Sequence, residues 1–468
     1  MGNKNIELHG VLVQDFAAEG KALAKVDGKV IFISGAVPGD VVDIRLGKNK
    51  KDWAEGRVIR FHELSKDRIL PFCEHFGTCG GCKWQMLPYK KQLEFKQNEV
   101  EQHLRRIGKV ALPPIAPILG CSNDTHYRNK LEFTFSNKRY LLAGEIGEDG
   151  FIPQQNALGF HVPKIFDKVI DIRTCYLMAE PTNAIRNTVR EFAMEQGYTF
   201  YDIKHHTGWL RNLILRICTT GEVMVNMCFG YEDKEERVKL FEHLLAKVPA
   251  ITTLLYTINP KWNDSIYDLH PQTYMGKGYA IEKLEDFQFK IGPKSFFQTN
   301  TLQGEKLYQI TRDFAELTGT ETIYDLYCGT GSIGIFLSGL AGKIIGVEVI
   351  VEAVDDAREN AALNGVQHAS FFTGDVINIC NDDFFAAHGK PDVIITDPPR
   401  AGMHEKLVQK ILDMEAPRVV YVSCNPATQA RDLALLDEKY AVTKIQPVDM
   451  FPHTHHIENV VQLSLRKG

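Results

Sequence analysis

The sequence predicts an α/β protein with a doubly wound parallel sheet at its carboxyl end, an OB-type β-barrel at its amino end and an α+β domain between them. From about residue 295 onward, apolar strands alternate with helical stretches, the pattern of a parallel sheet covered by helices. Residues 6–62 instead alternate short β-rich runs with turn signals, the pattern of a small barrel. Because 468 residues are too many for one ordinary core, we expect three domains, at 1–66, 67–290 and 291–468.

The expected barrel carries basic side chains along one hairpin, around Trp53. A surface that combines cations with an aromatic ring is typical of proteins that bind single-stranded RNA. A solvated hairpin gives the same pattern, so both interpretations stay open. The net charge of −5 argues only weakly against an RNA partner, because a whole-chain sum does not detect a local patch. The basic residues are Arg45, Lys48, Lys50, Lys51, Arg57 and Arg60, and the acidic residues among them are Asp52 and Glu55.

A helix over residues 88–108 is expected between the barrel and the rest of the middle domain. Pro88 suits the first turn of a helix, and Gly108 supplies its end. Apolar side chains at helical spacing predict one buried face. The residues of that face are Leu93, Val100, Leu104 and Ile107.

The composition is that of a globular protein outside the membrane. Hydrophobic residues make up 44% of the chain and charged residues 24%, as in ordinary domains. A short polar stretch precedes the first β-rich run, and no run of about 18 apolar residues is present. We therefore expect a cytoplasmic protein without membrane contact. Nothing indicates an obligate protein partner, so a monomer is expected.

A glycine-rich turn follows the first strand of the carboxyl-terminal sheet. Its glycines 329, 331 and 334 satisfy G-x-G-x-x-G, and Glu348 ends the next strand, which also fits a nicotinamide-binding unit. Two carboxylates favour another cofactor. Asp325 lies inside the strand, where it suits a cationic amino-acid group better than a pyrophosphate, and Asp397 opens the segment D-P-P-R after a later strand.

Taken together, the motifs D-L-Y-C-G-T-G, G-V-E, G-D and D-P-P resemble those of class I S-adenosylmethionine (SAM) methyltransferases. The resemblance implies a Rossmann-like domain in which Glu348 accepts hydrogen bonds from the ribose and Asp375 lies near the adenine. Within the turn, the expected cofactor contacts are Gly329, Gly331 and Ser332.

Cys424 follows an apolar strand and precedes Asn425 and Pro426, so it should lie at the carboxyl end of that strand, where such sheets bind ligands. A thiolate there suits methylation of uracil: its addition to carbon 6 makes carbon 5 nucleophilic, and a base must later remove the carbon 5 proton. Free thiols are mostly protonated near pH 7, so Cys424 needs a lowered pKa or a nearby base. Glu458, just before the last apolar strand, is the candidate base.

The remaining isolated cysteines and the carboxyl-terminal histidines have simpler interpretations. A lone cysteine usually packs as a small apolar side chain. We assign that role to Cys218, Cys228 and Cys380, favour it for Cys328 and leave Cys121 unassigned. Histidines spaced this tightly on a loop more often form hydrogen bonds or face solvent than bind a metal. They are His453, His455 and His456.

The motifs D-P-P-R, S-C-N-P-A-T-Q-A-R-D and H-x-E-N-V follow D-L-Y-C-G-T-G in this order. This set is similar to the 5-methyluridine RNA methyltransferase family, which includes bacterial 23S ribosomal RNA enzymes and tRNA uridine-54 enzymes. The resemblance implies that Cys424 is the nucleophile and Glu458 the proton-abstracting base. It also implies that the barrel is a TRAM domain, that residues 127–130 open the central RNA-binding domain and that helix 88–108 packs against the catalytic domain. Further implied contacts to cofactor or uracil are Gln298, Tyr327, Glu348 and Asp397.

Three cysteines in a glycine-rich loop have the spacing C-x5-C-x2-C: Cys73, Cys79 and Cys82. A zinc ribbon would need a second C-x2-C pair, which is absent, whereas a [4Fe-4S] cluster needs only one more thiolate. In the resembled enzymes this spacing holds such a cluster, and the fourth ligand matches Cys175; spacing alone leaves Cys121 open. The resemblance favours ribosomal RNA as substrate, because the bacterial tRNA enzymes generally lack the cluster. We expect the cluster to be structural.

The sequence therefore predicts SAM-dependent methylation of carbon 5 of a uridine in 23S ribosomal RNA. Two alternatives stay open: the same reaction on a tRNA uridine, and a non-catalytic RNA-binding protein with a vestigial methylase fold. Intact residues at 325, 424 and 458 argue against the second. A cytosine-5 enzyme is disfavoured, because such RNA enzymes place a cysteine after D-x-P, where this chain has Arg400.

Overall fold

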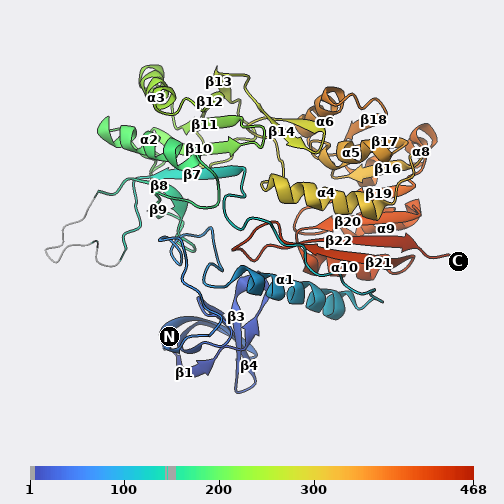
Figure 1. Cartoon of the computed structure of the whole chain (residues 1–468), viewed down its shortest axis with the longest axis horizontal. Coiled ribbons are helices and arrows are strands. Elements are labelled where there is room, and N and C mark those ends of the chain that lie inside the picture. Colours follow the sequence, from blue (N-terminus) through green and yellow to red (C-terminus); the bar gives the residue numbers. More distant parts are fainter. Residues whose placement is uncertain (1–5, 143–144, 146–153, 468) are drawn as a thin grey trace.

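The computed structural model describes residues 6–142, 145 and 154–467. The amino-terminal part is a six-stranded sheet in the order β1-β5-β6-β4-β3-β2, which forms the lower body in Figure 1. It encloses a core of small and β-branched side chains such as Ala24, Ile33 and Ile44. The strands are β1 (Glu7–Leu12), β2 (Asp15–Phe16), β3 (Ala22–Val26), β4 (Lys29–Ser34), β5 (Val41–Asn49) and β6 (Trp53–Glu63).

Helix α1 (Tyr89–His103) continues into a π-helical turn, Leu104–Gly108, and lies between the barrel and the carboxyl-terminal sheet (Figure 1). The helix occurs where the sequence predicts it, but the predicted apolar face is partly wrong. Ile107 is exposed, and the buried side chains of α1 include Gln92 and Lys96. The helix therefore buries a stripe at four-residue spacing that is half polar.

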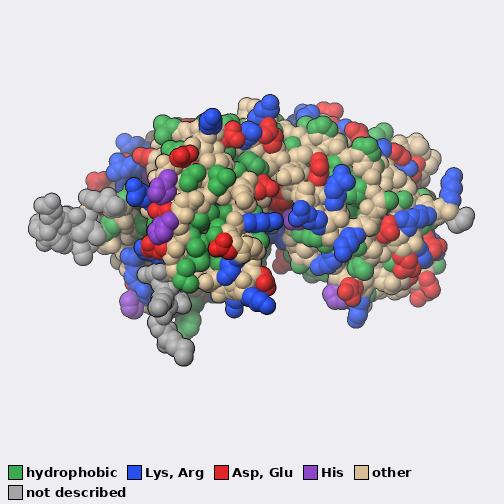
Figure 2. All heavy atoms as spheres, turned by 90° about the horizontal axis from the view of Figure 1, so that it is seen from below, with side chains coloured by type: hydrophobic (Ala, Val, Ile, Leu, Met, Phe, Trp, Pro, Cys, Tyr) green, Lys and Arg blue, Asp and Glu red, His purple; other side chains and the backbone are tan. Residues whose placement is uncertain are grey.

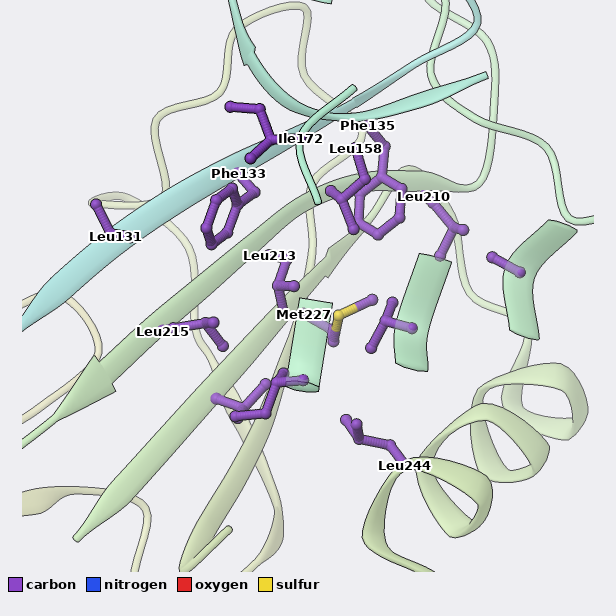
Figure 3. Close-up of a cluster of buried hydrophobic side chains, with 14 of the residues drawn as sticks. Leu131, Phe133, Phe135, Leu158, Ile172, Leu210, Leu213, Leu215, Met227 and Leu244 are labelled. Atoms are coloured by element: carbon purple, nitrogen blue, oxygen red, sulfur yellow. The ribbon is translucent and has the colours of Figure 1, made fainter. Parts of the chain in front are cut away.

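The central sheet has seven strands in the order β13-β12-β11-β10-β7-β8-β9. Helices α2 (Thr182–Glu195) and α3 (Lys234–Lys247) pack beside each other. Figure 3 shows apolar side chains from neighbouring strands, among them Leu213 and Met227, gathered with Leu244 of α3. The strands are β7 (Lys130–Ser136), β8 (Ala157–His161), β9 (Val169–Asp171), β10 (Leu210–Ile217), β11 (Val223–Phe229), β12 (Thr253–Ile258) and β13 (Gln272–Met275).

A hairpin, β14 (Ala280–Leu284) and β15 (Phe287–Ile291), joins this sheet to the carboxyl-terminal one. That sheet has seven strands in the order β18-β17-β16-β19-β20-β22-β21. Its strands are β16 (Thr322–Leu326), β17 (Lys343–Glu348), β18 (Ala369–Thr373), β19 (Val393–Thr396), β20 (Arg418–Ser423), β21 (Tyr440–Val448) and β22 (Glu458–Leu465). Its helices are α4 (Thr301–Ala315), α5 (Ser332–Leu337), α6 (Val351–Leu363), α7 (Val376–Ile379), α8 (Asp382–His388), α9 (Glu405–Met414) and α10 (Pro426–Leu436).

The carboxyl-terminal sheet confirms the predicted doubly wound fold. The direction of its last strands also distinguishes it from the sheet of a dinucleotide-binding domain. Strands β16 to β20 are parallel, whereas β22 runs antiparallel to β20 and β21. In the nicotinamide-binding fold all six strands are parallel in the order 3-2-1-4-5-6. The strand order reverses between β16 and β19, and ligands of such sheets bind outside the carboxyl ends of the strands at that point.

The division into 1–66, 67–290 and 291–468 stays a prediction, because the packing cuts across it. Val100 and Leu104 lie in one buried cluster with Tyr324, Ile345 and other side chains of the carboxyl-terminal sheet. No helix among the described residues is both long and apolar enough to cross a membrane.

Candidate active site

The loop after β16 takes three left-handed backbone conformations within five residues. Tyr327 has φ 63°, Gly329 φ 52° and Gly331 φ 73°. The glycines adopt this region without strain, whereas Tyr327 does so at a cost, which is common at functional sites. A Cβ on Gly329 would meet nothing within 4 Å, so that side of the loop is open. A Cβ on Gly331 would lie 3.0 Å from Ala357 and Phe371, so Gly331 serves packing against α6.

Asp325 is buried under this loop, and only one of its two carboxylate oxygens has a hydrogen-bond partner among the described residues. Its Oδ2 accepts a hydrogen bond from the Gly334 backbone N–H at 2.9 Å. Its Oδ1 has no partner among the described residues. Burial, and after it the nearby carboxylates of Asp397 and Glu348, raises the pKa of Asp325 to about 7. A buried acceptor without a donor is costly, and a ligand ammonium group would relieve that cost.

Glu348 and Asp375 line one cavity of about 320 Å³ beside the loop, together with Tyr327. Glu348 accepts from the Val349 backbone N–H at 2.8 Å and from the Gly329 N–H at 3.2 Å, so it holds the loop in place. Asp375 is exposed and caps α7 through the Ile377 N–H. The volume lies at the lower end of the range for small-molecule sites.

Tyr308 of α4 connects the residues on this side of the crevice, and the sequence analysis missed it. Its hydroxyl lies 2.8 Å from Ser332 Oγ, and the side chain of Gln298 is near enough to lower its pKa. Burial is the main cause of a raised pKa at Tyr308, to which the carboxylates of Asp397 and Asp325 add. Nothing in the sequence separates Tyr308 from an ordinary core residue of an amphipathic helix.

Cys424 and Glu458 lie across from each other at the same edge of the sheet. Ser423 of β20 pairs with Asn459 of β22, so the adjoining residues Cys424 and Glu458 are next in register. Asn425 caps α10, with its side chain accepting from Ala427 N–H, and Pro426 fills the first helical position. The chain therefore leaves the strand directly at Cys424.

The thiol of Cys424 does not have the lowered pKa that the sequence analysis allowed for. Burial, then the carboxylates of Glu458 and Asp397, raises its pKa to about 11, while the guanidinium of Arg400 acts in the opposite direction. Burial also raises the pKa of Glu458 well above its ordinary value, and that of Asp397 to about 7. The other option, a nearby base, fits better: two carboxyl groups with raised pKa values face the thiol.

Arg400 is the second residue that the sequence analysis gave no role in the site. Its guanidinium hydrogen-bonds His456 Nδ1, and its carbonyl accepts from Asn425 Nδ2 at 3.0 Å. Burial, followed by the neighbouring His455 and Arg400, lowers the pKa of His456 to about 3. A neutral His456 therefore accepts from Arg400 at neutral pH, which holds this cation beside Cys424.

The cysteine loop lies against the central sheet. Cys79 and Cys82 pack on its apolar core, to which the buried Cys175 belongs. Burial raises the pKa of Cys82 to about 12, and the thiols of Cys79, Cys175 and Cys73 add to that rise. Cys121 lies elsewhere, with its thiol 3.0 Å from the Asp449 carbonyl. Within residues 6–142 and 154–467, no group of three or more His, Cys, Asp or Glu is arranged to hold a metal ion.

The other isolated cysteines behave as predicted. Cys218, Cys228, Cys328 and Cys380 are buried. On the barrel, Lys48 lies 4.9 Å from the centre of the Trp53 ring, and Arg45, Lys48 and Arg57 line a cavity of about 430 Å³. Figure 2 shows Lys and Arg side chains among Asp and Glu over the face seen from below, so the net negative charge does not make this face uniformly acidic.

Comparisons with known proteins match both ends of the chain to described families. The family model described as tRNA (Uracil-5-)-methyltransferase matches residues 267–466, and that of the TRAM domain matches residues 9–59. An uncharacterised RNA methyltransferase of Bacteroides thetaiotaomicron is 54% identical over 96% of this chain and all of its own length. One of Porphyromonas gingivalis is 49% identical over 96% of this chain and 98% of its own.

The chain belongs to the RNA (uracil-5-)-methyltransferase family. It is a SAM-dependent RNA methyltransferase with an amino-terminal TRAM domain. The solved tRNA (uracil-54, C5)-methyltransferase of Pyrococcus abyssi, in complex with S-adenosyl-L-homocysteine, matches with a TM-score of 0.75 and 27% identity. The match covers 97% of this methyltransferase and 100% of that chain.

Proposed function

We propose that this methyltransferase acts on carbon 5 of a uridine in 23S ribosomal RNA, with Cys424 as nucleophile and Glu458 as base. The observation that carries the proposal is the facing pair of Cys424 and Glu458 at the carboxyl edge of the sheet, beside the half-buried Asp397. A thiol opposite a protonatable carboxyl group is the pair of functions that uracil methylation requires. The flipped uracil would lie between them, because a stacked base cannot reach the thiol.

The cofactor is proposed to lie over the loop after β16. Asp325 Oδ1, which has no donor among the described residues, suits the ammonium group of the methionine part, and Glu348 suits the ribose hydroxyls. Exposed Val349 and Ile350 and the residues around Asp375 offer apolar surface for an adenine. SAM supplies a methyl group on a cationic sulfur. Gln298 and Ser332, which both lie beside Tyr308, close the side nearer the uracil.

The chain's residues then perform two proton transfers. Cys424 passes its proton to the carboxylate of Asp397, whose pKa is about 7, as its sulfur adds to carbon 6, and Arg400 favours the thiolate by its charge. After methyl transfer, carbon 5 carries both the new methyl group and its original hydrogen. Glu458 removes that hydrogen as a proton while the bond between Cys424 and carbon 6 breaks. The buried position of Glu458 raises its pKa, which makes its carboxylate a stronger base than an exposed one.

Two variants test these roles separately. Cys424→Ala should abolish both turnover and the stable adduct with 5-fluorouracil RNA, in which fluorine cannot leave as a proton. Glu458→Gln should still add and methylate, so covalent enzyme–RNA complex accumulates on ordinary RNA and is visible by denaturing electrophoresis. Turnover by the alanine variant rejects the nucleophile, and normal release by the glutamine variant rejects the base.

A tRNA uridine is the second candidate substrate, favoured by the similarity to the Pyrococcus abyssi tRNA enzyme over nearly the whole chain. We rank ribosomal RNA first because of the cysteine loop. Mapping 5-methyluridine in ribosomal RNA and tRNA from cells with and without the gene decides between them. Loss confined to tRNA would overturn the ribosomal assignment, and loss in neither would reject both. An RNA substrate and free thiols also point to the cytoplasm.

We further propose that Cys73, Cys79, Cys82 and Cys175 hold a structural [4Fe-4S] cluster. The four thiols act on one another electrostatically, whereas Cys121 is hydrogen-bonded to the Asp449 carbonyl instead. A cubane spaces its thiolates farther apart than a single ion spaces its ligands, so the proposal does not require that the described residues form a single-ion site. After anaerobic purification, we expect iron and sulfide in equal amounts, lost in Cys175→Ser and kept in Cys121→Ser; the reverse result reassigns the fourth ligand.

A further inference from the structure

The residues between β21 and β22 form a loop, 449–457, that we name the catalytic loop because Glu458 follows it. It begins one residue after Val448, and Val448 is the cross-strand partner of Glu458. It also carries His456, which holds Arg400. Any shift of this loop therefore moves both the proposed base and the cation beside Cys424.

A buried ion pair attaches the catalytic loop to helix α1. Lys96 Nζ donates to Asp449 Oδ1 at 2.6 Å, and both side chains are completely inaccessible to solvent. The same Nζ donates to the Phe451 carbonyl at 3.2 Å. Tyr89, also on α1, donates its hydroxyl to Asp449 Oδ2 at 2.8 Å. Both oxygens of Asp449 are thus bound by α1, at a distance of more than 350 residues along the chain.

Gln92, one helical turn before Lys96, holds the middle of the same loop. Its Oε1 accepts from the His453 backbone N–H at 2.8 Å, and its Nε2 lies 3.1 Å from His453 Nδ1. Gln92 is also fully buried. The polar half of the buried stripe of α1, Gln92 and Lys96, is therefore the part of the helix that binds the catalytic loop.

The stability of the fold does not explain this arrangement. Two buried charges cost their hydration, and a well-packed apolar pair of similar volume would stabilise a core at least as well. The ion pair instead restricts the path of the loop, because Lys96 can donate to Asp449 and to the Phe451 carbonyl together only when the loop has this conformation. Resting on the proposed role of Glu458, we propose that Lys96 is a positioning residue, whose pair with Asp449 fixes the catalytic loop and thereby the base.

The test is the double variant Lys96→Met with Asp449→Leu, which removes both charges and leaves neither unpaired. We expect it to bind SAM within about twofold of wild type but to lose about 100-fold in kcat, the cost of misplacing a reacting group by about an ångström. Because Cys424 directly follows β20 and is not on the loop, addition should be less affected than proton removal. Covalent enzyme–RNA complex should therefore accumulate on ordinary RNA, which general destabilisation would not cause.

Lys91→Met is the matched control, since Lys91 lies on the same helix but pairs with the partly exposed Asp67 and Glu94 at the surface; it should behave as wild type. If the double variant does not fold, Tyr89→Phe provides the test, because it removes the hydrogen bond to Asp449 Oδ2. It should lose less kcat and still accumulate covalent enzyme–RNA complex. Wild-type kcat, or a loss without accumulated complex, overturns the proposal. Glu458→Gln distinguishes the proposed base from the proposed positioning residue. If Glu458→Gln accumulates covalent complex and the α1 variants do not, the role of Glu458 stands and only the positioning role of Lys96 fails.

Discussion

Asp325→Asn should increase the stability of the cofactor-free protein and weaken the binding of SAM. The folded protein raises the pKa of Asp325 from 3.8 to about 7, which corresponds to about 4 kcal/mol of unfavourable free energy for the ionised form at pH 7 and above. Asparagine keeps the acceptor for the Gly334 N–H and removes the charge. Its NH2 group inherits the position of Oδ1, which already lacks a partner among the described residues, so that cost largely cancels.

The sign of the pH dependence follows from proton binding. Between pH 3.8 and about 7, the folded state keeps the proton on Asp325 that the unfolded state has lost. The contribution of this group to stability therefore falls as pH rises through that window, and is constant above it. The advantage of Asp325→Asn should be small at pH 4, grow through the window and level off above pH 7.

Denaturant unfolding of the cofactor-free proteins at pH 5 and pH 8, with SAM affinity measured by calorimetry, checks both effects. Removing the charge opposite a buried ammonium group should cost about 2 to 5 kcal/mol of binding, or about 30-fold and more in Kd. An asparagine variant with wild-type SAM affinity refutes the assignment of Asp325 to the ammonium group. A gain in stability that is equal at both pH values refutes the electrostatic argument.

Three further outcomes are expected. Arg400→Gln should raise the pKa of the Cys424 thiol further, since it removes the cation that lowers it; alkylation by iodoacetamide should then need a higher pH, and an unchanged pH profile would contradict this. Tyr308→Phe, which loses the 2.8 Å hydrogen bond to Ser332, should weaken SAM binding by about 1 kcal/mol, or about fivefold; calorimetry that finds no change argues against a cofactor-facing role. Trp53→Ala should weaken RNA binding in a filter assay and leave SAM affinity unchanged, because it removes the ring beside Lys48.

Local pattern was sufficient to predict the amino-terminal barrel, the carboxyl-terminal sheet and the ends of the strands that precede Asp397 and Cys424 or carry Asp325. Those residues stand where an apolar run meets a glycine, a proline or a capping asparagine, and such signals survive in one sequence. The electrostatic state of the thiol could not be predicted in this way. It depends on Glu458, which adjoins Cys424 only through the antiparallel insertion of β22 beside β20.

The predicted buried face of α1 was partly wrong for a related reason: Val100 and Leu104 are buried as predicted, but Lys96 is buried as well. Helical periodicity identifies apolar side chains, and it assigns Lys96 to solvent by default, because lysine is almost never fully buried unless it is paired. Its partner Asp449 lies more than 350 residues away, so no window of sequence contains both. Tyr308 illustrates the opposite limit, since a tyrosine that faces a ligand and one that fills a core have the same local pattern.

The packing of α1 also affects the order in which this chain can fold as it is made. The helix ends at His103, but helix α10, which packs against α1 and its π-helical turn, begins at Pro426. At ribosomal speeds of about 5 to 20 residues per second, the helix waits on the order of 15 to 65 seconds for its partner. During that interval the central sheet can form around its own core, while α1 keeps its apolar and charged face open to water. Chaperone binding to nascent chains should therefore be strongest for chains released between these two points.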